Sequence, residues 1–183
     1  PASGGIAALF DKDLGHDFAG RYEGWRPGDY IYETVESPKG RDAIASFDFS
    51  NPDFFTGFKD TPWRRSGATS VQIGAPVIAN GRASITATIR ADGVASARVT
   101  YALDTGTKAV QIDWLIDKLA HEAPEAVFAA FPFNLGAPRF MLDLNGIPAV
   151  PNADQLDGAA KDWYPLQRWV DVSDGARGVT LVP

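Results

Sequence analysis

Residues 84–117 alternate apolar and polar side chains with a period of two, and this pattern constrains the fold more than any other feature of the chain. In an extended strand, neighbouring side chains point to opposite faces, so a period of two predicts strands with one apolar face. Three such stretches follow one another, and their apolar members are Ile85, Ala87 and Ile89, then Ala97, Val99, Tyr101 and Leu103, then Val110, Ile112, Trp114 and Ile116.

The segments between these stretches carry turn residues. Asp92-Gly93 separates the first two, and Asp104-Thr105-Gly106 separates the second from the third. Glycine accepts the positive φ of a tight hairpin turn, so both segments predict antiparallel hairpins. We therefore expect a meander of three strands whose apolar face is covered by a second sheet, with Trp114 in the core.

Further strands are predicted before and after the meander. Residues 125–133 are apolar at both parities, which predicts a strand buried on both sides at the centre of the sandwich. A strand at 140–144 is expected to end at Asn145-Gly146, and Asp174-Gly175 is expected to join strands at 166–172 and 178–182. Residues 30–35 are predicted to form an edge strand. A two-turn helix at 42–49 is the one helical candidate.

The composition is that of an ordinary globular protein, with 183 residues, 45% hydrophobic and 22% charged. We expect an all-β fold, a large antiparallel β-sandwich, with residues 1–183 forming a single domain that is a fragment of a larger protein. The net charge of −6 and the lack of a basic cluster exclude a nucleic-acid partner. No apolar run has the length of a membrane span. The compartment stays open.

Motifs for catalysis are not found. The two histidines, His16 and His121, stand far apart and leave no set of three zinc ligands. The acidic residues in 11–15 fit a tight turn better than a calcium loop, because Tyr22 stands where that loop needs glutamate. There is no Gly-x-Ser-x-Gly elbow and no phosphate-binding glycine loop. We expect neither a catalytic residue nor a metal ligand in this chain.

One proline-framed segment combines side chains that suit a sugar. Pro148, Pro151 and Pro165 frame residues 152–163 as a loop. Aromatic faces pack against the C–H surface of a sugar, while carboxylate, amide and guanidinium groups bind its hydroxyls. The candidate substrate-binding residues are Asp154, Gln155, Asp162, Trp163, Tyr164 and Arg168. The alternative is a surface loop that Trp163 anchors into the core.

The same region carries a family resemblance. The runs at 125–133, 154–156 and 162–174, together with Gly4-Gly5-Ile6 and the Asp11-Lys12 turn, resemble the C-terminal β-sandwich region of bacterial glycoside hydrolase family 38-like proteins, relatives of α-mannosidases. The matching ends bracket nearly the whole chain. Animal members of the family lack the Asp162–Tyr164 and Trp169–Val172 runs. The resemblance therefore does not identify the sugar that the parent protein recognises.

This resemblance implies a supersandwich of the galactose mutarotase-like type. It also implies a non-catalytic, carbohydrate-associated domain, whose partners would be carbohydrate and the missing catalytic domain of the same polypeptide. The zinc of the family belongs to that catalytic domain, so no cofactor is expected here and the isolated chain is expected to be inactive.

Two other functions stay open. The first is a free-standing aldose epimerase-like enzyme, which requires a His acid and a carboxylate base, here His121 with Glu122 or Glu125. The second is a structural interaction module without sugar contact. If the chain is a domain separated from its catalytic partner, the aromatic segment from Trp25 to Trp63 is expected to expose apolar surface and to support a weak homodimer. Its candidate contacts are Phe54, Phe55, Phe58 and Trp63.

Overall fold

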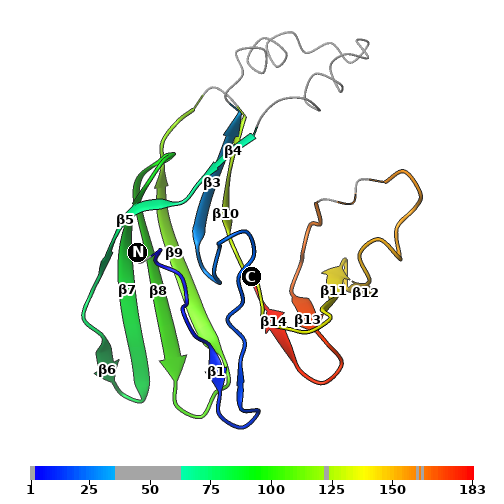
Figure 1. Ribbon diagram of the computed structural model, residues 1–183, viewed down its shortest axis with the longest axis horizontal. Helices are drawn as coiled ribbons and strands as arrows, with labels where there is room; N and C mark the ends of the chain where they lie inside the picture. Colours follow the sequence, from blue (N-terminus) through cyan, green and yellow to red (C-terminus); the bar gives the residue numbers. More distant parts are fainter. Residues whose placement is uncertain (1–2, 36–62, 122–123, 160, 162) are drawn as a thin grey trace. The chain divides into compact units, whose positions relative to one another are not determined.

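A computed structural model of the chain describes residues 3–35, 63–121, 124–159, 161 and 163–183 (Figure 1). These residues form an all-β fold, and none of them lies in a helix. Among them, accordingly, no helix has the length and apolar character needed to cross a membrane. The chain divides into two compact units. The larger unit contains residues 1–6 and 25–131, and the smaller unit contains residues 7–24 and 132–183.

The larger unit contains two antiparallel sheets. The five-stranded sheet has the order β5-β7-β8-β9, with β6 also paired to β7, and the three-stranded sheet has the order β10-β3-β4. The five strands are β5 (Ala68–Ile73), β6 (Val77–Ala79), β7 (Arg82–Ala91), β8 (Val94–Asp104) and β9 (Val110–Lys118). The other three are β3 (Tyr30–Val35), β4 (Trp63–Ser66) and β10 (Glu125–Ala129).

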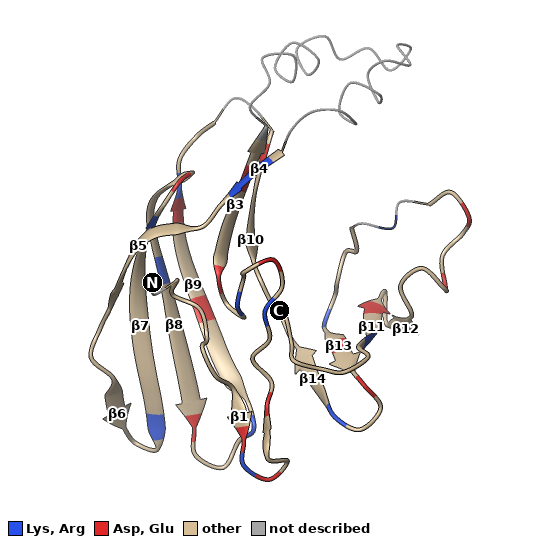
Figure 2. Cartoon of the chain, viewed as in Figure 1, with Lys and Arg blue, Asp and Glu red and all other residues tan. Residues whose placement is uncertain are grey.

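The predicted meander is confirmed as β7-β8-β9. Gly93 and Gly106 adopt φ of 76° and 82° in the two hairpin turns, as a residue without Cβ can. Ion pairing closes the far end of the first hairpin, where Arg82 Nη1 lies 2.7 Å from Asp104 Oδ2. Figure 2 shows opposite charges at these strand ends.

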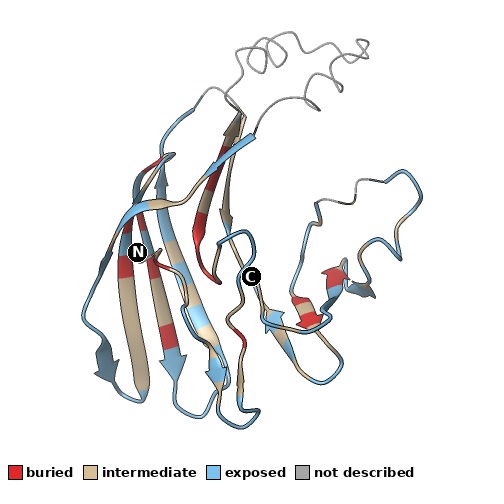
Figure 3. Ribbon diagram, in the orientation of Figure 1, coloured by how far each residue is buried: buried red, intermediate tan, exposed pale blue. Residues whose placement is uncertain are grey.

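The core of the larger unit lies between its two sheets. Buried positions gather on β3, β7 and β8 (Figure 3), and one cluster joins Tyr30, Tyr32, Ala87, Ile89, Val94, Ala97 and Val99. Trp114 packs against this cluster, with its ring centroid 6.3 Å from that of Tyr30. The second sheet that the apolar face required is therefore the one built on β3.

Two strand positions differ from the sequence-based expectation. β10 was expected at a sheet centre, but it pairs with β3 at the edge of its sheet, and its residues are half-buried or exposed. β3 was expected at an edge and lies in the centre. The small side chains of Ala126 and Ala129 explain part of the difference for β10. Alanine makes both faces of the strand apolar in the sequence, but its side chain is too small to fill a core.

The smaller unit contains a two-stranded and a four-stranded sheet. The hairpin of β1 (Phe10–Asp11) and β2 (His16–Asp17) confirms the tight turn, in which Asp11 Oδ1 accepts from the amides of Asp13 and Leu14. The larger sheet has the order β12-β11-β13-β14. Its strands are β11 (Arg139–Leu144), β12 (Ile147–Ala149), β13 (Val170–Ser173) and β14 (Gly178–Leu181).

The predicted turn after β11 is confirmed. Asn145 and Gly146, with φ of 55° and 81°, end β11, and the short strand β12 that follows them was not predicted. Pro148 lies in this edge strand, before the loop that it was expected to frame. The strand expected at 166–172 begins only at Val170. Leu142, Val170 and Val172 form the core of this sheet. The helix expected at 42–49 lies outside the described residues.

Candidate functional site

The predicted sugar-binding loop connects β12 to β13 in the smaller unit. Its first turn is closed by Asp154, whose Oδ2 accepts a hydrogen bond of 2.8 Å from the Val150 amide. The Asp154 amide in turn donates to the Val150 carbonyl over 3.1 Å. Aspartate side chains commonly stabilise turns in this way, and one carboxylate oxygen of Asp154 is thereby engaged within the loop.

Gln155 and Tyr164 lie together across the loop. The Tyr164 hydroxyl donates to Gln155 Oε1 over 2.9 Å, and the Asn152 amide donates to the same oxygen over 3.1 Å. The Tyr164 ring packs against the cluster of Leu142, Val170 and Val172. Among the described residues, the two arms of the loop are thus joined to each other and to the sheet.

Trp163 remains largely exposed beside this junction. Its exposed fraction is 66%, so the expectation that Trp163 anchors the loop into the core is wrong. The next residue, Tyr164, performs that role instead. The remaining predicted residue of the loop, Asp162, lies outside the described residues.

Arg168 pairs with a residue that the sequence did not single out. Its Nε lies 2.7 Å from Oδ2 of Asp143, which is only 1% exposed and lies on β11. The hydrogen bond from Arg168 lowers the pKa of Asp143 although burial opposes this, and Asp143 in turn raises the pKa of Arg168. Both groups therefore stay charged over the whole physiological range.

The structure thus brings some of the predicted residues together and leaves others apart. Asp154, Gln155 and Tyr164 share one hydrogen-bonded loop with the exposed Trp163, whereas Arg168 is tied to the sheet through Asp143. Asp143 was missed because an acidic residue at the polar parity of a strand normally faces solvent. The one sequence feature that could have drawn attention to Asp143 was its position two residues before the Asn145-Gly146 turn.

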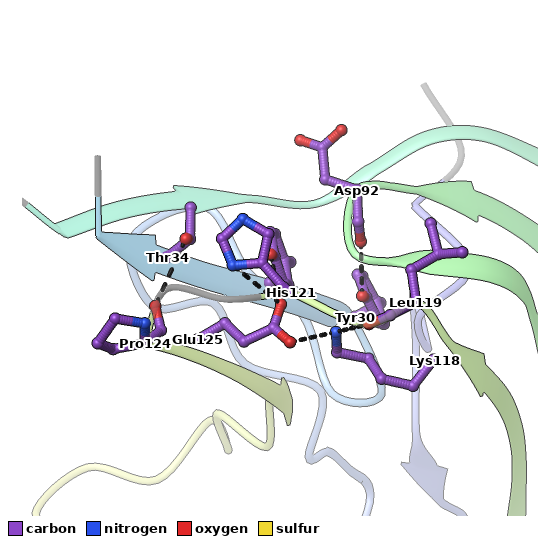
Figure 4. A network of polar contacts seen from close by, with 9 residues as sticks. Tyr30, Thr34, Asp92, Lys118, Leu119, His121, Pro124 and Glu125 are labelled. Carbon is purple, nitrogen blue, oxygen red and sulfur yellow. Dashed lines mark hydrogen bonds and ion pairs between the residues drawn. The ribbon is translucent and has the colours of Figure 1, made fainter. Parts of the chain in front are cut away.

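A second polar cluster, in the larger unit, centres on Glu125 (Figure 4). Its Oε2 accepts a hydrogen bond of 2.5 Å from the Tyr32 hydroxyl, and Lys118 Nζ donates to its Oε1 over 2.5 Å. The Nδ1 of His121 lies 4.0 Å from Oε2 of Glu125. Burial pushes the pKa of Glu125 up, but the hydrogen bonds from Lys118 and Tyr32 and the nearby positive charges outweigh it, so the pKa is lowered.

This cluster bears on the epimerase alternative. His121 and Glu125 do lie near each other, as that function requires. However, both oxygens of Glu125 already accept hydrogen bonds, and a lowered pKa makes a carboxylate a weaker base. A salt bridge between the two sheets describes the cluster better than an acid–base pair that faces a substrate. Glu122 lies outside the described residues.

The described residues do not fit a zinc site. No three histidine, aspartate or glutamate side chains among them converge as metal ligands would. His16 uses Nε2 to contact the Asn134 carbonyl over 2.7 Å, in the smaller unit, and His121 stands beside Glu125 in the larger one. We therefore assign no chemical step of this chain to a metal.

Comparison with known proteins adds no family to these observations. No family model matches the chain, and no curated protein matches it.

Proposed function

We propose that this chain is the non-catalytic, carbohydrate-associated C-terminal domain of an α-mannosidase-like glycoside hydrolase, with a supersandwich fold of the galactose mutarotase-like type. The residue runs at 4–15, 125–133 and 162–174 support this proposal through their family resemblance. The all-β fold of paired antiparallel sheets agrees with it.

The observation that carries the proposal is the exposed ring of Trp163 next to the hydrogen-bonded pair of Tyr164 and Gln155. Its exposed fraction is 66%, so the indole presents an apolar face at the surface that a ligand can cover. The hydrogen bond between Tyr164 and Gln155 holds polar groups close to this ring in sequence. A flat aromatic face with nearby polar groups is the surface that a sugar ring recognises.

The catalytic part of this function belongs to another domain of the proposed polypeptide. That domain would supply the zinc and the nucleophile, and the present chain would contribute part of the wall around the substrate. The proposed partners are therefore carbohydrate and that catalytic domain. The proposed carbohydrate is not limited to mannosides, because no residue of the loop corresponds to a known mannose contact.

The proposal is tested by titrating the ¹⁵N-labelled chain with methyl α-mannoside and other methyl glycosides. We expect saturable shifts of the Trp163 and Tyr164 resonances at millimolar sugar, the weak range typical of small ligands. Trp163→Ala is expected to abolish them. Trp63→Ala is the matched control, since Trp63 is also exposed, at 47%, but lies on β4.

Two outcomes would contradict the proposal. Saturable shifts that survive Trp163→Ala but are lost with Trp63→Ala would place sugar recognition elsewhere. No shift with any glycoside would favour the alternative, a structural interaction module in which Trp163 contacts a protein.

A further inference from the structure

Arg168 presents hydrogen-bond donors that the fold positions but does not use. Of its five N–H groups, the one on Nε donates to Asp143, and its side chain is 67% exposed. Within the described part of the chain, no acceptor takes a hydrogen from Nη1 or Nη2. A guanidinium cannot lose its proton in proteins, so these four hydrogens remain donors at any physiological pH.

The backbone on either side of Arg168 is fixed. The Gln167 amide donates to the Asp143 carbonyl over 3.3 Å, and the Asp143 amide donates to the Trp169 carbonyl over 3.0 Å. The arginine is therefore bracketed by two main-chain hydrogen bonds to the residue that its side chain also contacts. The backbone on both sides of Arg168 and its Nε atom are therefore all joined to one buried residue of β11.

The turn after β11 lies beside the guanidinium. A Cβ on Gly146 would lie 3.7 Å from Arg168 Nη2, at ordinary contact distance. The neighbouring Asn145 is engaged by Gln167, whose Nε2 donates to Asn145 Oδ1 over 3.0 Å.

The electrostatics favour a neutral ligand. Asp143 balances the charge of Arg168, so the pair is formally neutral, and the chain carries a net charge of −6. An anionic ligand would approach a formally neutral pair on an acidic protein and gain little from long-range attraction. Two adjacent hydroxyl oxygens, by contrast, can each accept a hydrogen bond from the guanidinium without adding charge.

We propose that Arg168, held by Asp143, donates hydrogen bonds from its Nη atoms to adjacent hydroxyls of a neutral sugar and so determines the class of carbohydrate that the smaller unit binds. This inference rests on the proposed function. Asp143 acts as a positioning residue, because it orients the guanidinium without meeting the ligand itself.

The direct test follows the guanidinium resonances of Arg168 during titration with methyl α-mannoside and, separately, with the corresponding methyl mannuronoside. We expect the Nη signals to shift with the neutral sugar at the same midpoint as Trp163, while the Nε–H signal, tied to Asp143, stays protected from exchange. Tighter binding of the uronate would overturn the neutral-sugar assignment and indicate carboxylate recognition.

Variants of Arg168 and Asp143 distinguish the planar guanidinium geometry from the positive charge alone. Arg168→Lys keeps a cation beside the buried Asp143 but loses the planar fork, and we expect affinity to fall about tenfold, as for one charge-assisted hydrogen bond. Asp143→Asn keeps the arginine but weakens its anchor, so we expect lower affinity together with faster exchange of the Nε–H proton. Arg139→Lys, at the exposed start of β11, is the matched control and should bind as the unmodified chain does.

Folding is checked through the resonances of Val170 and Val172, which report the core of the same sheet. Full affinity in a folded Arg168→Lys chain would overturn this inference while leaving the proposed function intact. Absence of binding to any glycoside in the unmodified chain would overturn both.

Discussion

Glu125 connects the two sheets of the larger unit through single hydrogen bonds. Lys118, at the end of β9, belongs to the five-stranded sheet, whereas Tyr32 and Glu125 belong to the three-stranded one. The ammonium of Lys118 also lies 5.7 Å from the Tyr32 ring centroid, which adds a cation–π contact. The Glu125 carboxylate therefore contacts the Lys118 ammonium and the Tyr32 phenol and lies near the His121 imidazole.

The lowered pKa of Glu125 predicts how stability depends on pH. Because the folded state favours the ionised carboxylate, its contribution is present above the usual glutamate pKa of about 4.3 and is lost as the pH falls through the lowered value. We expect Glu125→Gln to lower the urea midpoint at pH 7 and to flatten its decline below about pH 4. Asp117→Asn, at an exposed position of β9, is the control. An unchanged pH profile in Glu125→Gln would contradict the assignment.

Gly5 supports a second prediction at this scale. A Cβ on Gly5 would lie 2.2 Å from Asp29 Oδ1 and 2.9 Å from the Pro27 carbonyl, so a side chain cannot fit without backbone movement. We expect Gly5→Ala to lower the free energy of unfolding by about 1–3 kcal/mol, as overpacking does. Gly136→Ala, where no atom lies within 4 Å, should change it by less than about 0.5 kcal/mol. Equal effects of the two substitutions in thermal unfolding would contradict the close packing of Gly5.

At the scale of elements, β9 displays the alternation most clearly. Trp114 packs on the core cluster, while its neighbour Leu115 is 60% exposed on the opposite face. The indole nitrogen of Trp114 is buried without a hydrogen-bond partner among the described residues. The strand thus packs a partly buried aromatic ring on the core and leaves its N–H without a partner among the described residues, so the ring and not its polar edge accounts for the stabilisation.

Adjacent substitutions in β9 test this facing. We expect Trp114→Ala to cost about 3–5 kcal/mol of unfolding free energy, because it removes a large, partly buried aromatic side chain that packs on the core cluster. Leu115→Ala should cost less than about 1 kcal/mol. Chemical denaturation of both variants gives the comparison. A larger loss for Leu115→Ala would mean that the register of β9 is misassigned.

Local patterns explain which elements the sequence could predict. A period of two and a glycine turn are properties of neighbouring residues, so β7, β8 and β9 and the turns at Gly93, Gly106 and Gly146 were predicted correctly. Which strands pair across long distances is not a local property. The place of β10 at an edge beside β3 was therefore missed.

The candidate site shows the same limit. The loop between β12 and β13 and its aromatic residues were visible in the sequence. The burial of Asp143 and its pairing with Arg168 were not, because they depend on the register of β11 with β13, where Leu142 faces Val170. The contact of Tyr164 with Gln155 was likewise set by the turn that Asp154 closes.

At the scale of the whole molecule, the sequence predicted one sandwich domain over residues 1–183. The chain divides into two compact units, and the single domain stays a prediction. Each unit has its own core, one built on β3, β7 and β8 and the other on β11 and β13. Neither core supplies a converging set of metal ligands among the described residues. Under the proposed function, catalysis belongs to the proposed partner domain.

This expectation is tested on the isolated chain. We expect no stoichiometric zinc by elemental analysis and no hydrolysis of nitrophenyl glycosides, with or without added zinc, because three converging ligands are needed for a catalytic zinc site. The purified chain should also show a cooperative unfolding transition, which excludes misfolding as the reason. One zinc per chain that survives mild chelation would contradict the proposed division of roles.

Self-association is the last prediction, and it concerns Trp63 on β4. Of the four aromatic residues predicted to form a weak homodimer, Phe54, Phe55 and Phe58 lie outside the described residues. Trp63 is 47% exposed on a strand that pairs only with β3 among the described strands. An exposed indole on an edge strand favours pairing with a second copy, but so small a patch predicts a weak, concentration-dependent interface below about 1,200 Å².

We therefore expect sedimentation velocity to show a monomer that associates reversibly as the protein concentration rises. Trp63→Ser should shift this equilibrium toward the monomer, because it removes the apolar side chain and leaves the strand hydrogen bonds to β3 in place. Trp163→Ser removes another exposed indole, from the loop of the other unit, and should leave association unchanged. Association that persists in Trp63→Ser but disappears in Trp163→Ser would assign the self-contact to the proposed sugar-binding loop, and Trp163 would then serve a protein interface in place of a carbohydrate.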